Sequence, residues 1–175
     1  MSGVNSGVFT GSGFTTNPYS RQLDANGWAT TGLSDTSKGF GTSNTSGDHA
    51  RGLISGGVST GGLNSFDLGG GNRALGFQPT GSDWTPGTIT LKISNNSTSV
   101  INDMDFDYNI FIRNNQNKTN SFNFSYSCNN SSYTNASAGD YTSPQASGSS
   151  AWVVTNKIIN LDGLGIKPKE NFYTR

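Results

Sequence analysis

The amino-acid sequence predicts an all-β protein, an antiparallel β-sandwich of the jelly-roll type, and three observations indicate this fold. Gly, Ser, Asn and Thr make up about half of the 175 residues, and these residue types favour turns over helices. In the middle of the chain apolar residues alternate with polar ones, which is the period of a half-buried strand. Turn-forming residues recur about every 8–12 positions. A parallel β-helix is the alternative fold, which we disfavour because the sequence has no coil-length repeat.

The first half of the chain predicts short strands separated by glycine-rich turns. The candidate strands are 27–29, 50–54, 62–68 and 73–77. Residues 34–48 are expected to form a long polar loop, and residues 1–19 a flexible or edge segment. We therefore place a single β-sandwich domain at residues 20–175, a length sufficient for a hydrophobic core.

The strongest strand patterns lie between residues 88 and 128. In 88–94, three aliphatic residues alternate with Thr and Lys. In 101–113, apolar and aromatic residues share one face and acidic residues the other, and in 121–128 aromatic residues alternate with Ser and Asn. The polar segment between these two strands predicts a hairpin loop. We expect them to pair antiparallel and to supply much of the core.

The last third of the chain is less regular. Residues 129–150 are expected to form a second long polar loop. Residues 152–154 and 157–161 predict two short strands or one bent strand. Residues 171–175 begin a further strand.

Charge and hydropathy exclude some partners. The 11 basic residues balance the 11 acidic ones and form no basic run, so no nucleic-acid partner is expected. No stretch approaches the ~20 apolar residues of a membrane span, and we expect no membrane insertion. The polar composition is typical of extracellular proteins, which predicts a secreted or cell-surface location.

Few residues are suited to catalysis. The chain has one histidine (His49), one cysteine (Cys128) and one glutamate (Glu170), and it has no pattern that brings two carboxylates across a cleft. We therefore expect no enzymatic activity.

Aromatic residues near hydrogen-bonding side chains form the candidate binding site. Trp84 follows Asp83 in a turn-like stretch, and Tyr133 and Tyr141 lie in the second polar loop. Such a set offers an apolar platform and polar partners for sugar hydroxyls, so these four residues are the candidate glycan-binding site. The alternative is that the tryptophans pack against the core.

Three aspartates alternate along one predicted strand and point to one face: Asp103, Asp105 and Asp107. Calcium favours such oxygen ligands, but the three carboxylates would spread over about 13 Å. A solvated polar face is the favoured interpretation. No cofactor is expected, and a structural calcium ion that uses one of the aspartates with a loop residue is the alternative.

Several segments together resemble a known family. They are 23–28, 62–67, the Asn-Arg-Ala-Leu-Gly segment 72–76, 87–96, 121–127 and the Phe-Tyr-Thr-Arg segment 172–175. Over residues 20–175 the chain resembles a jelly-roll-like module near the N-termini of large secreted Bacteroidota proteins. Those proteins often carry nuclease, lamin-tail or adhesin-like domains and a type IX sorting tail.

The resemblance implies a non-catalytic accessory or interaction module of a secreted or cell-surface bacterial protein. A carbohydrate-binding module is one alternative. Family members usually continue past the Phe-Tyr-x-Arg strand to a closing strand, whereas this sequence ends at Arg175, as expected of a fragment, a truncated copy or a subunit whose sheet is completed by another chain. The second alternative is therefore a self-assembling extracellular subunit, in which another chain fills the open sheet edge. The expected partners are a glycan, another extracellular protein or a second copy.

Overall fold

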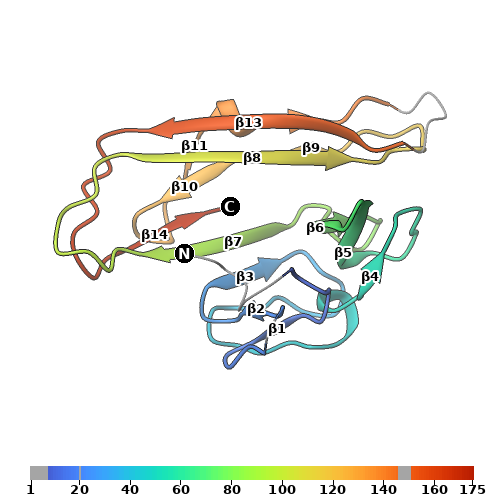
Figure 1. Cartoon of the computed structure of the whole chain (residues 1–175), viewed down its shortest axis with the longest axis horizontal. Helices are drawn as coiled ribbons and strands as arrows, with labels where there is room; N and C mark the ends of the chain where they lie inside the picture. The colour runs from blue at the N-terminus through green and yellow to red at the C-terminus, as the bar shows by residue number, and fades with distance from the viewer. Residues whose placement is uncertain (1–7, 20, 146–150) are drawn as a thin grey trace. The chain divides into compact units, whose positions relative to one another are not determined.

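The computed structural model describes residues 8–19, 21–145 and 151–175, and these residues form strands joined by turns and two short 3-10 helices (Figure 1). The all-β prediction is confirmed. The longer strand pairs are antiparallel and build no solenoid, so the β-helix alternative is wrong. Contacts within the chain form two compact units, the N-terminal unit (residues 1–91) and the C-terminal unit (residues 92–175). The single-domain boundary at 20–175 stays a prediction.

The N-terminal unit is built from short strands. They are β1 (Phe14–Thr15), β2 (Leu23–Asp24), β3 (Trp28–Thr31), β4 (Leu53–Ile54), β5 (Gly62–Gly69) and β6 (Asn72–Gln78), with the 3-10 helix η1 (Gly47–His49) before β4. The β5–β6 hairpin is antiparallel, and its turn contains three consecutive glycines with positive φ, Gly69, Gly70 and Gly71, as a tight reversal requires. β3 pairs antiparallel with the first part of β7 (Thr88–Ser94), while β1–β2 and β4–β5 are short parallel pairs.

The apolar core of the N-terminal unit is small. Five buried residues form it: Phe9, Phe14, Leu23, Ala25 and Leu63. Phe9 and Phe14 belong to the segment 1–19 that the sequence predicts to be flexible or at an edge. Residues 1–7 of that segment lie outside the described residues. Half-buried aromatic residues, including Trp28 and Trp84, pack against this core.

The C-terminal unit contains the longest strands of the protein. They are β8 (Met104–Ile112), β9 (Ser121–Phe122), β10 (Ser125–Ser127), β11 (Thr134–Asn135), β12 (Tyr141–Thr142), β13 (Val153–Leu161) and β14 (Asn171–Thr174), with the 3-10 helix η2 (Ser137–Gly139) before β12. β8 and β13 pair with each other in one layer, and the order β11-β10-β14-β7 gives the other layer (Figure 1). The described part of the expected loop 129–150 thus contains β11, η2 and β12, and residues 146–150 lie outside the described residues.

An aromatic core fills the space between these two layers. Phe106 of β8 lies 5.4 Å from Phe124 and 6.2 Å from Phe172, measured between ring centroids, and Tyr126 stacks on Phe172 at 5.8 Å. Ile159 and Leu161 of β13 are buried with them. This unit is therefore a two-layer sandwich whose facing strands place mainly apolar side chains between the layers.

The expected pairing of residues 101–113 with 121–128 is wrong. β8 pairs along all nine residues with β13, which comes much later in the chain, and β10 pairs with β11 and β14. The two aromatic strands do meet, but across the core rather than side by side, as the ring contact of Phe106 with Phe124 shows. Alternation indicates which face of a strand is buried, and it does not identify the strand's hydrogen-bonded neighbour.

Candidate functional site

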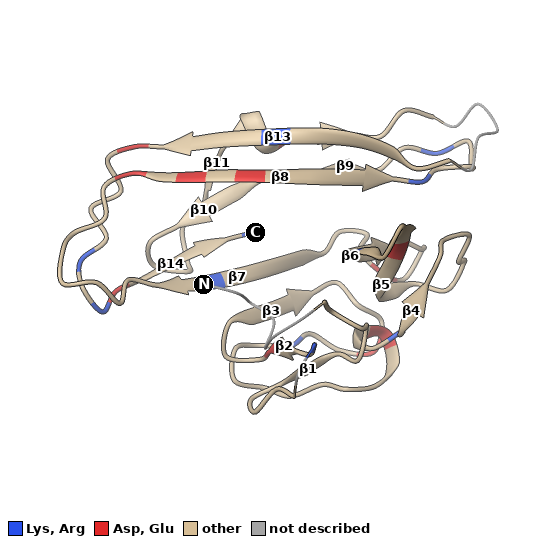
Figure 2. Ribbon diagram, in the orientation of Figure 1, with Lys and Arg blue, Asp and Glu red and all other residues tan. Residues whose placement is uncertain are grey.

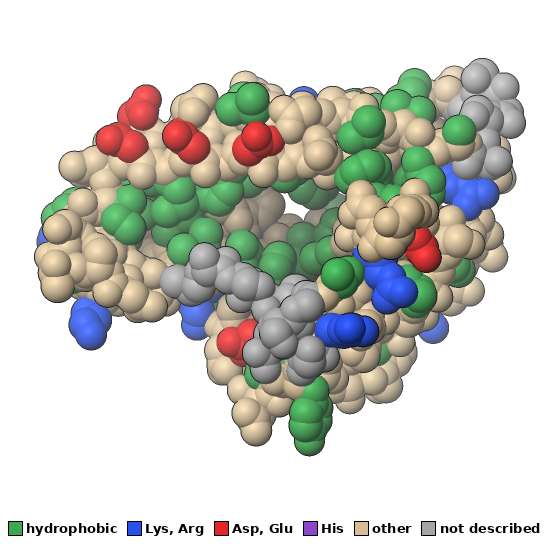
Figure 3. Space-filling view, in the orientation of Figure 1, with side chains coloured by type: hydrophobic (Ala, Val, Ile, Leu, Met, Phe, Trp, Pro, Cys, Tyr) green, Lys and Arg blue, Asp and Glu red, His purple; other side chains and the backbone are tan. Residues whose placement is uncertain are grey.

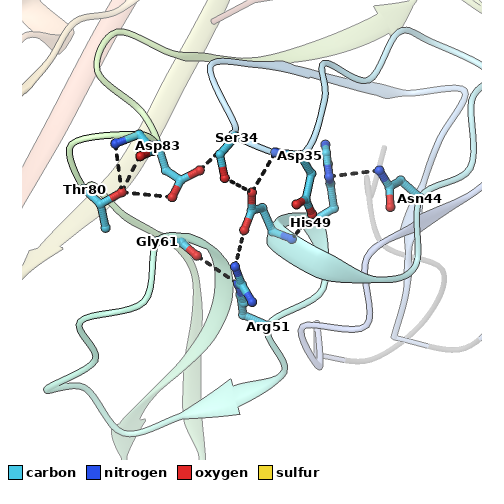
Figure 4. Close-up of polar contacts among 10 residues, drawn as sticks. Ser34, Asp35, Asn44, His49, Arg51, Gly61, Thr80 and Asp83 are labelled. Carbon is cyan, nitrogen blue, oxygen red and sulfur yellow. Dashed lines mark hydrogen bonds and ion pairs between the residues drawn. The ribbon is translucent and has the colours of Figure 1, made fainter.

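A buried polar network occupies the N-terminal unit and centres on Asp48 in η1 (Figure 4). One carboxylate oxygen of Asp48 accepts hydrogen bonds from the Ser34 hydroxyl (2.7 Å) and the Asp35 amide (3.0 Å), and the other forms an ion pair with Arg51. Burial acts to raise the pKa of Asp48. The hydrogen bonds from Ser34 and Asp35 and the charge of Arg51 outweigh it, so the pKa lies below the ordinary aspartate value.

Asp83 extends the same network. One of its carboxylate oxygens accepts from the Ser34 amide at 2.7 Å and the other from the Thr80 hydroxyl at 2.9 Å. Ser34 therefore joins the two carboxylates, with its hydroxyl on Asp48 and its amide on Asp83. Arg51 also donates to the carbonyl of Gly61. These hydrogen bonds join four segments of the unit, namely residues 34–35, 48–51, 61 and 80–83. They involve charged groups and are therefore stronger than neutral hydrogen bonds.

The only histidine of the chain lies at the edge of this network. His49 is 0% exposed and contacts the Phe14 ring edge-on. The Asn44 side-chain amide lies 3.0 Å from Nδ1, and the Thr30 hydroxyl lies 3.0 Å from Nε2. Since the amide nitrogen of Asn44 donates to Nδ1, the neutral ring carries its proton on Nε2 and donates it to Thr30. Burial lowers the pKa of His49, which favours this neutral form.

The arrangement Thr30–His49–Asn44 has the order of a nucleophile, a base and an orienting group, but the protonated Nε2 cannot take the proton of the Thr30 hydroxyl. Thr30 is only 1% exposed, so substrate cannot reach its hydroxyl in this conformation. Cys128, the other candidate nucleophile, is exposed and belongs to the C-terminal unit. The hydrogen bonds of His49 to Thr30 and Asn44 therefore hold the surrounding loops in place.

A buried lysine completes the polar interior. Lys38 is 1% exposed, and its ammonium group donates to the carbonyls of Trp28 (2.5 Å), Gly39 (3.3 Å) and Ala25 (3.4 Å) and lies 4.6 Å from the centroid of the Phe14 ring. Burial lowers the pKa of Lys38 to about 8, against an opposing effect of Asp24. The sequence does not predict that Lys38 is buried, because residues 34–48 have the composition of an ordinary polar loop.

Two members of the predicted glycan site lie in the N-terminal unit, in the interior or close to it. Asp83 is buried, and both of its oxygens are used within the protein. Trp84 is half-buried against the core, and its ring contacts Phe77 at a centroid distance of 4.9 Å. The indole Nε1 is buried without a hydrogen-bond partner among the described residues. The Asp83 side chain is therefore not presented to solvent, and the Trp84 ring is half-buried, as are the rings of Tyr133 and Tyr141.

The other two members, Tyr133 and Tyr141, lie in the C-terminal unit. The guanidinium group of Arg175 lies 3.7 Å from the centroid of the Tyr133 ring, and the hydroxyl of Tyr133 donates to Asn130. The ammonium group of Lys157 lies 5.7 Å from the centroid of the Tyr141 ring. Each tyrosine thus already has a cation over its ring.

The longest strand pair of the C-terminal unit consists of β8 and β13, and we call it the β8–β13 ribbon. Their nine residues pair in register from Val153↔Ile112 to Leu161↔Met104. Neither strand has a second strand neighbour among the described residues, and no backbone hydrogen bond joins either outer edge to another described segment. The ribbon therefore has two free edges, each able to accept a further strand.

The two strands of the ribbon differ in charge. Asp105 and Asp107 lie on the outer face of β8. In Figure 2 acidic positions are coloured on β8 and none on β13. Acidic side chains gather on the surface over the ribbon in Figure 3. On this face Asn156 donates to Asp107 at 2.7 Å, and Asn160 donates to Asp105 at 2.6 Å. The predicted acidic face is thus tied to β13 by amide hydrogen bonds.

No three or more His, Cys, Asp or Glu side chains of the described residues group in a way that could hold a metal ion. Within residues 8–19, 21–145 and 151–175, no helix is long and apolar enough to cross a membrane. Comparison of the chain with protein-family models, curated proteins and solved structures finds no match.

Proposed function

We propose that this chain is a non-catalytic interaction module of a secreted or cell-surface bacterial protein, and that it binds other polypeptides by adding a strand to the β8–β13 ribbon. One observation carries the proposal, which is that both edges of a nine-residue in-register ribbon are unpaired among the described residues. An extended peptide gains main-chain hydrogen bonds along such an edge, and side-chain contacts on the two faces give selectivity.

The location of the open edge differs from the one that the family resemblance implies. β14, the last strand, lies between β10 and β7 and is not an edge of its sheet. The edges that we propose for strand addition are instead those of the β8–β13 ribbon. The secreted setting and the kinship with the Bacteroidota module remain part of the proposal, supported by the polar composition and by the segments of the resemblance.

A selection of binders from a library of displayed random peptides tests this function. We expect the selected peptides to be extended, and hydrogen exchange of the full chain should show that they protect backbone amides of β8 or β13. For peptides that bind along β13, Ile158→Lys should weaken binding. Val100→Lys is the matched control, since Val100 is also exposed but lies outside the ribbon. Peptides that protect no ribbon amide would contradict the proposal.

Carbohydrate binding at Asp83, Trp84, Tyr133 and Tyr141 stays a prediction. The two rings of this predicted site that belong to the C-terminal unit are those of Tyr133 and Tyr141. Both rings would have to bind a sugar beside a cation, Arg175 or Lys157. A glycan array with the wild type and with Tyr133→Ala and Tyr141→Ala tests it. A glycan whose binding is lost in either variant would favour this function, and equal binding by all three proteins would exclude the two tyrosines.

A further inference from the structure

We propose that the occupant of the β13 edge is a second copy of this chain, and that two copies pair their β13 strands antiparallel in a sheet of order β8–β13–β13–β8. This inference rests on the proposed function, because it names the partner of the same ribbon. A two-fold pairing of this kind is self-complementary, since each copy offers the same edge to the other.

The charges on the ribbon favour β13 over β8 as the self-pairing edge. Full-length antiparallel pairing of two β8 strands would bring the Asp107 residues of the two copies to diagonal positions about 7–8 Å apart on the same face, where like charges repel. Pairing through β13 instead separates the two β8 strands by about 14 Å, three strand spacings. That distance exceeds the Debye length of about 8 Å at physiological salt, so the acidic strands are screened from each other.

The outer face of β13 suits contact with a copy of itself. It carries Val154, Asn156, Ile158 and Asn160, which are all uncharged. Val154 is 56% exposed and Ile158 is 57% exposed, a high exposure for large aliphatic side chains. Antiparallel pairing places outer-face residues of one copy beside outer-face residues of the other, so both aliphatic side chains lose contact with water.

β13 also lacks the residues that usually prevent an edge strand from pairing with another chain. Five of its nine residues are β-branched, and it contains no proline. Lys157 is its only charged residue. The ammonium group of Lys157 is drawn toward the inner face, where it donates to the Asp140 carbonyl at 2.5 Å. Edge strands of monomeric proteins are commonly blocked by an outward lysine, a proline or a bulge, and β13 has none of these.

The size of this contact predicts a weak dimer. One strand edge of nine residues buries less area than a standard protein interface, so we expect a dissociation constant on the order of 10 µM or weaker. Sedimentation equilibrium of the full chain up to about 1 mM covers this range. The mass should rise with concentration from 18.4 kDa toward twice that value.

Two variants with the same change of charge test which edge is used. Ile158→Lys places a lysine opposite Asp107 of its own chain, which suits the monomer, but brings two lysines together in the dimer. We expect it to weaken association by about tenfold or more. Asn109→Lys adds the same charge to the same face on β8, and we expect association to stay within about twofold of the wild type.

Hydrogen exchange of the wild type gives a readout that needs no variant. As the concentration rises, amides of β13 should gain protection, and those of β8 should not. A mass of 18.4 kDa at every concentration would overturn the inference, as would a dimer in which β13 gains no protection or which Ile158→Lys leaves intact. Peptides that still protect the ribbon in the library experiment would then leave the proposed function standing, with a partner other than a second copy.

Discussion

The two units of this chain stabilise β-structure in different ways. In the C-terminal unit, the two nine-residue strands β8 and β13 face a layer of shorter strands across aromatic rings, and nearly all the large inward side chains are apolar. In the N-terminal unit, most strands are two to four residues long, and the buried interior includes Lys38, Asp48, His49 and Asp83. The difference teaches that extended backbone can be fixed either by alternating apolar residues or by buried side chains that hydrogen-bond to loops.

The apolar core and the buried polar network should respond differently to amino-acid substitutions. An apolar core loses stability in proportion to the volume and area removed from it. A buried polar network is affected more by the loss of one partner, because the remaining donors and acceptors are left buried and unsatisfied. The N-terminal unit should therefore respond sharply to single polar substitutions and to pH, and the C-terminal unit to changes of side-chain volume.

The largest effect is expected for Asp48→Ala. This change leaves Arg51, the Ser34 hydroxyl and the Asp35 amide without their common acceptor. We expect the free energy of unfolding to fall by about 3–5 kcal/mol, measured by urea denaturation followed by circular dichroism. Asp103→Ala removes the same charge from an exposed position and should cost less than about 0.5 kcal/mol. Equal effects of the two substitutions would show that the network contributes little.

The pH dependence of stability gives the next largest effect. The pKa of Lys38 is lowered from 10.5 to about 8 in the folded protein, so between these values the folded state binds fewer protons than the unfolded state. The contribution of Lys38 to the free energy of unfolding should therefore rise from about pH 8 to about pH 10.5, by on the order of 3 kcal/mol. Denaturation at a series of pH values measures this rise.

Lys38→Met is the control for that experiment. Methionine keeps a long unbranched side chain and has no titrating group, so the rise between pH 8 and 10.5 should disappear whatever the effect on stability at neutral pH. A rise that persists in Lys38→Met would assign it to another group. Lys157→Met, in the C-terminal unit, should leave the rise unchanged.

The sequence predicted the C-terminal unit better than the N-terminal one, for a physical reason. Alternation in residues 88–94 and 101–113 identified β7 and β8 nearly to their ends, because one face of each strand is buried against apolar side chains. β13 was predicted as two short pieces or one bent strand, since the polar residues Thr155 and Asn156 separate its two apolar segments. Strand partners could not be predicted, because backbone hydrogen bonds leave no trace in the pattern of side chains.

The N-terminal unit was predicted only in outline. Strands near 27–29, 62–68 and 73–77 were expected, but the loop 34–48 gave no sign that Lys38 and Asp48 are buried. A polar residue is predicted to be exposed unless its hydrogen-bond partners are known. The partners of Lys38 and Asp48 lie in other segments of the N-terminal unit, so the sequence does not identify them. The same limitation applies to the glycan site. Asp83 and Trp84 lie in a turn as expected, but the Asp83 side chain is buried and Trp84 packs against the core.

A glycine of ordinary backbone conformation tests the tightness of the aromatic core. A Cβ atom at Gly139 would lie 2.5 Å from the Cβ of Phe124 and 2.7 Å from the Cδ1 of Ile159. Gly139→Ala should therefore lower the free energy of unfolding by about 1–3 kcal/mol through overpacking. Gly39→Ala is the matched control, because a Cβ at Gly39 meets no atom within 4 Å. Thermal unfolding of both variants measures the difference, and similar melting temperatures would indicate a core that yields easily.

The smallest effect compares two neighbouring isoleucines of β13. Ile159 is 1% exposed and packs in the aromatic core, whereas Ile158 is 57% exposed on the outer face. Ile159→Val removes one buried methylene and should cost about 0.5–1.5 kcal/mol. Ile158→Val removes the same group from an exposed side chain, so it should change the free energy of unfolding by less than about 0.5 kcal/mol. Measured at low concentration, where the chain is monomeric, a reversed order would mean that β13 presents its other face to the core, and the outer face proposed for self-pairing would then be the wrong one.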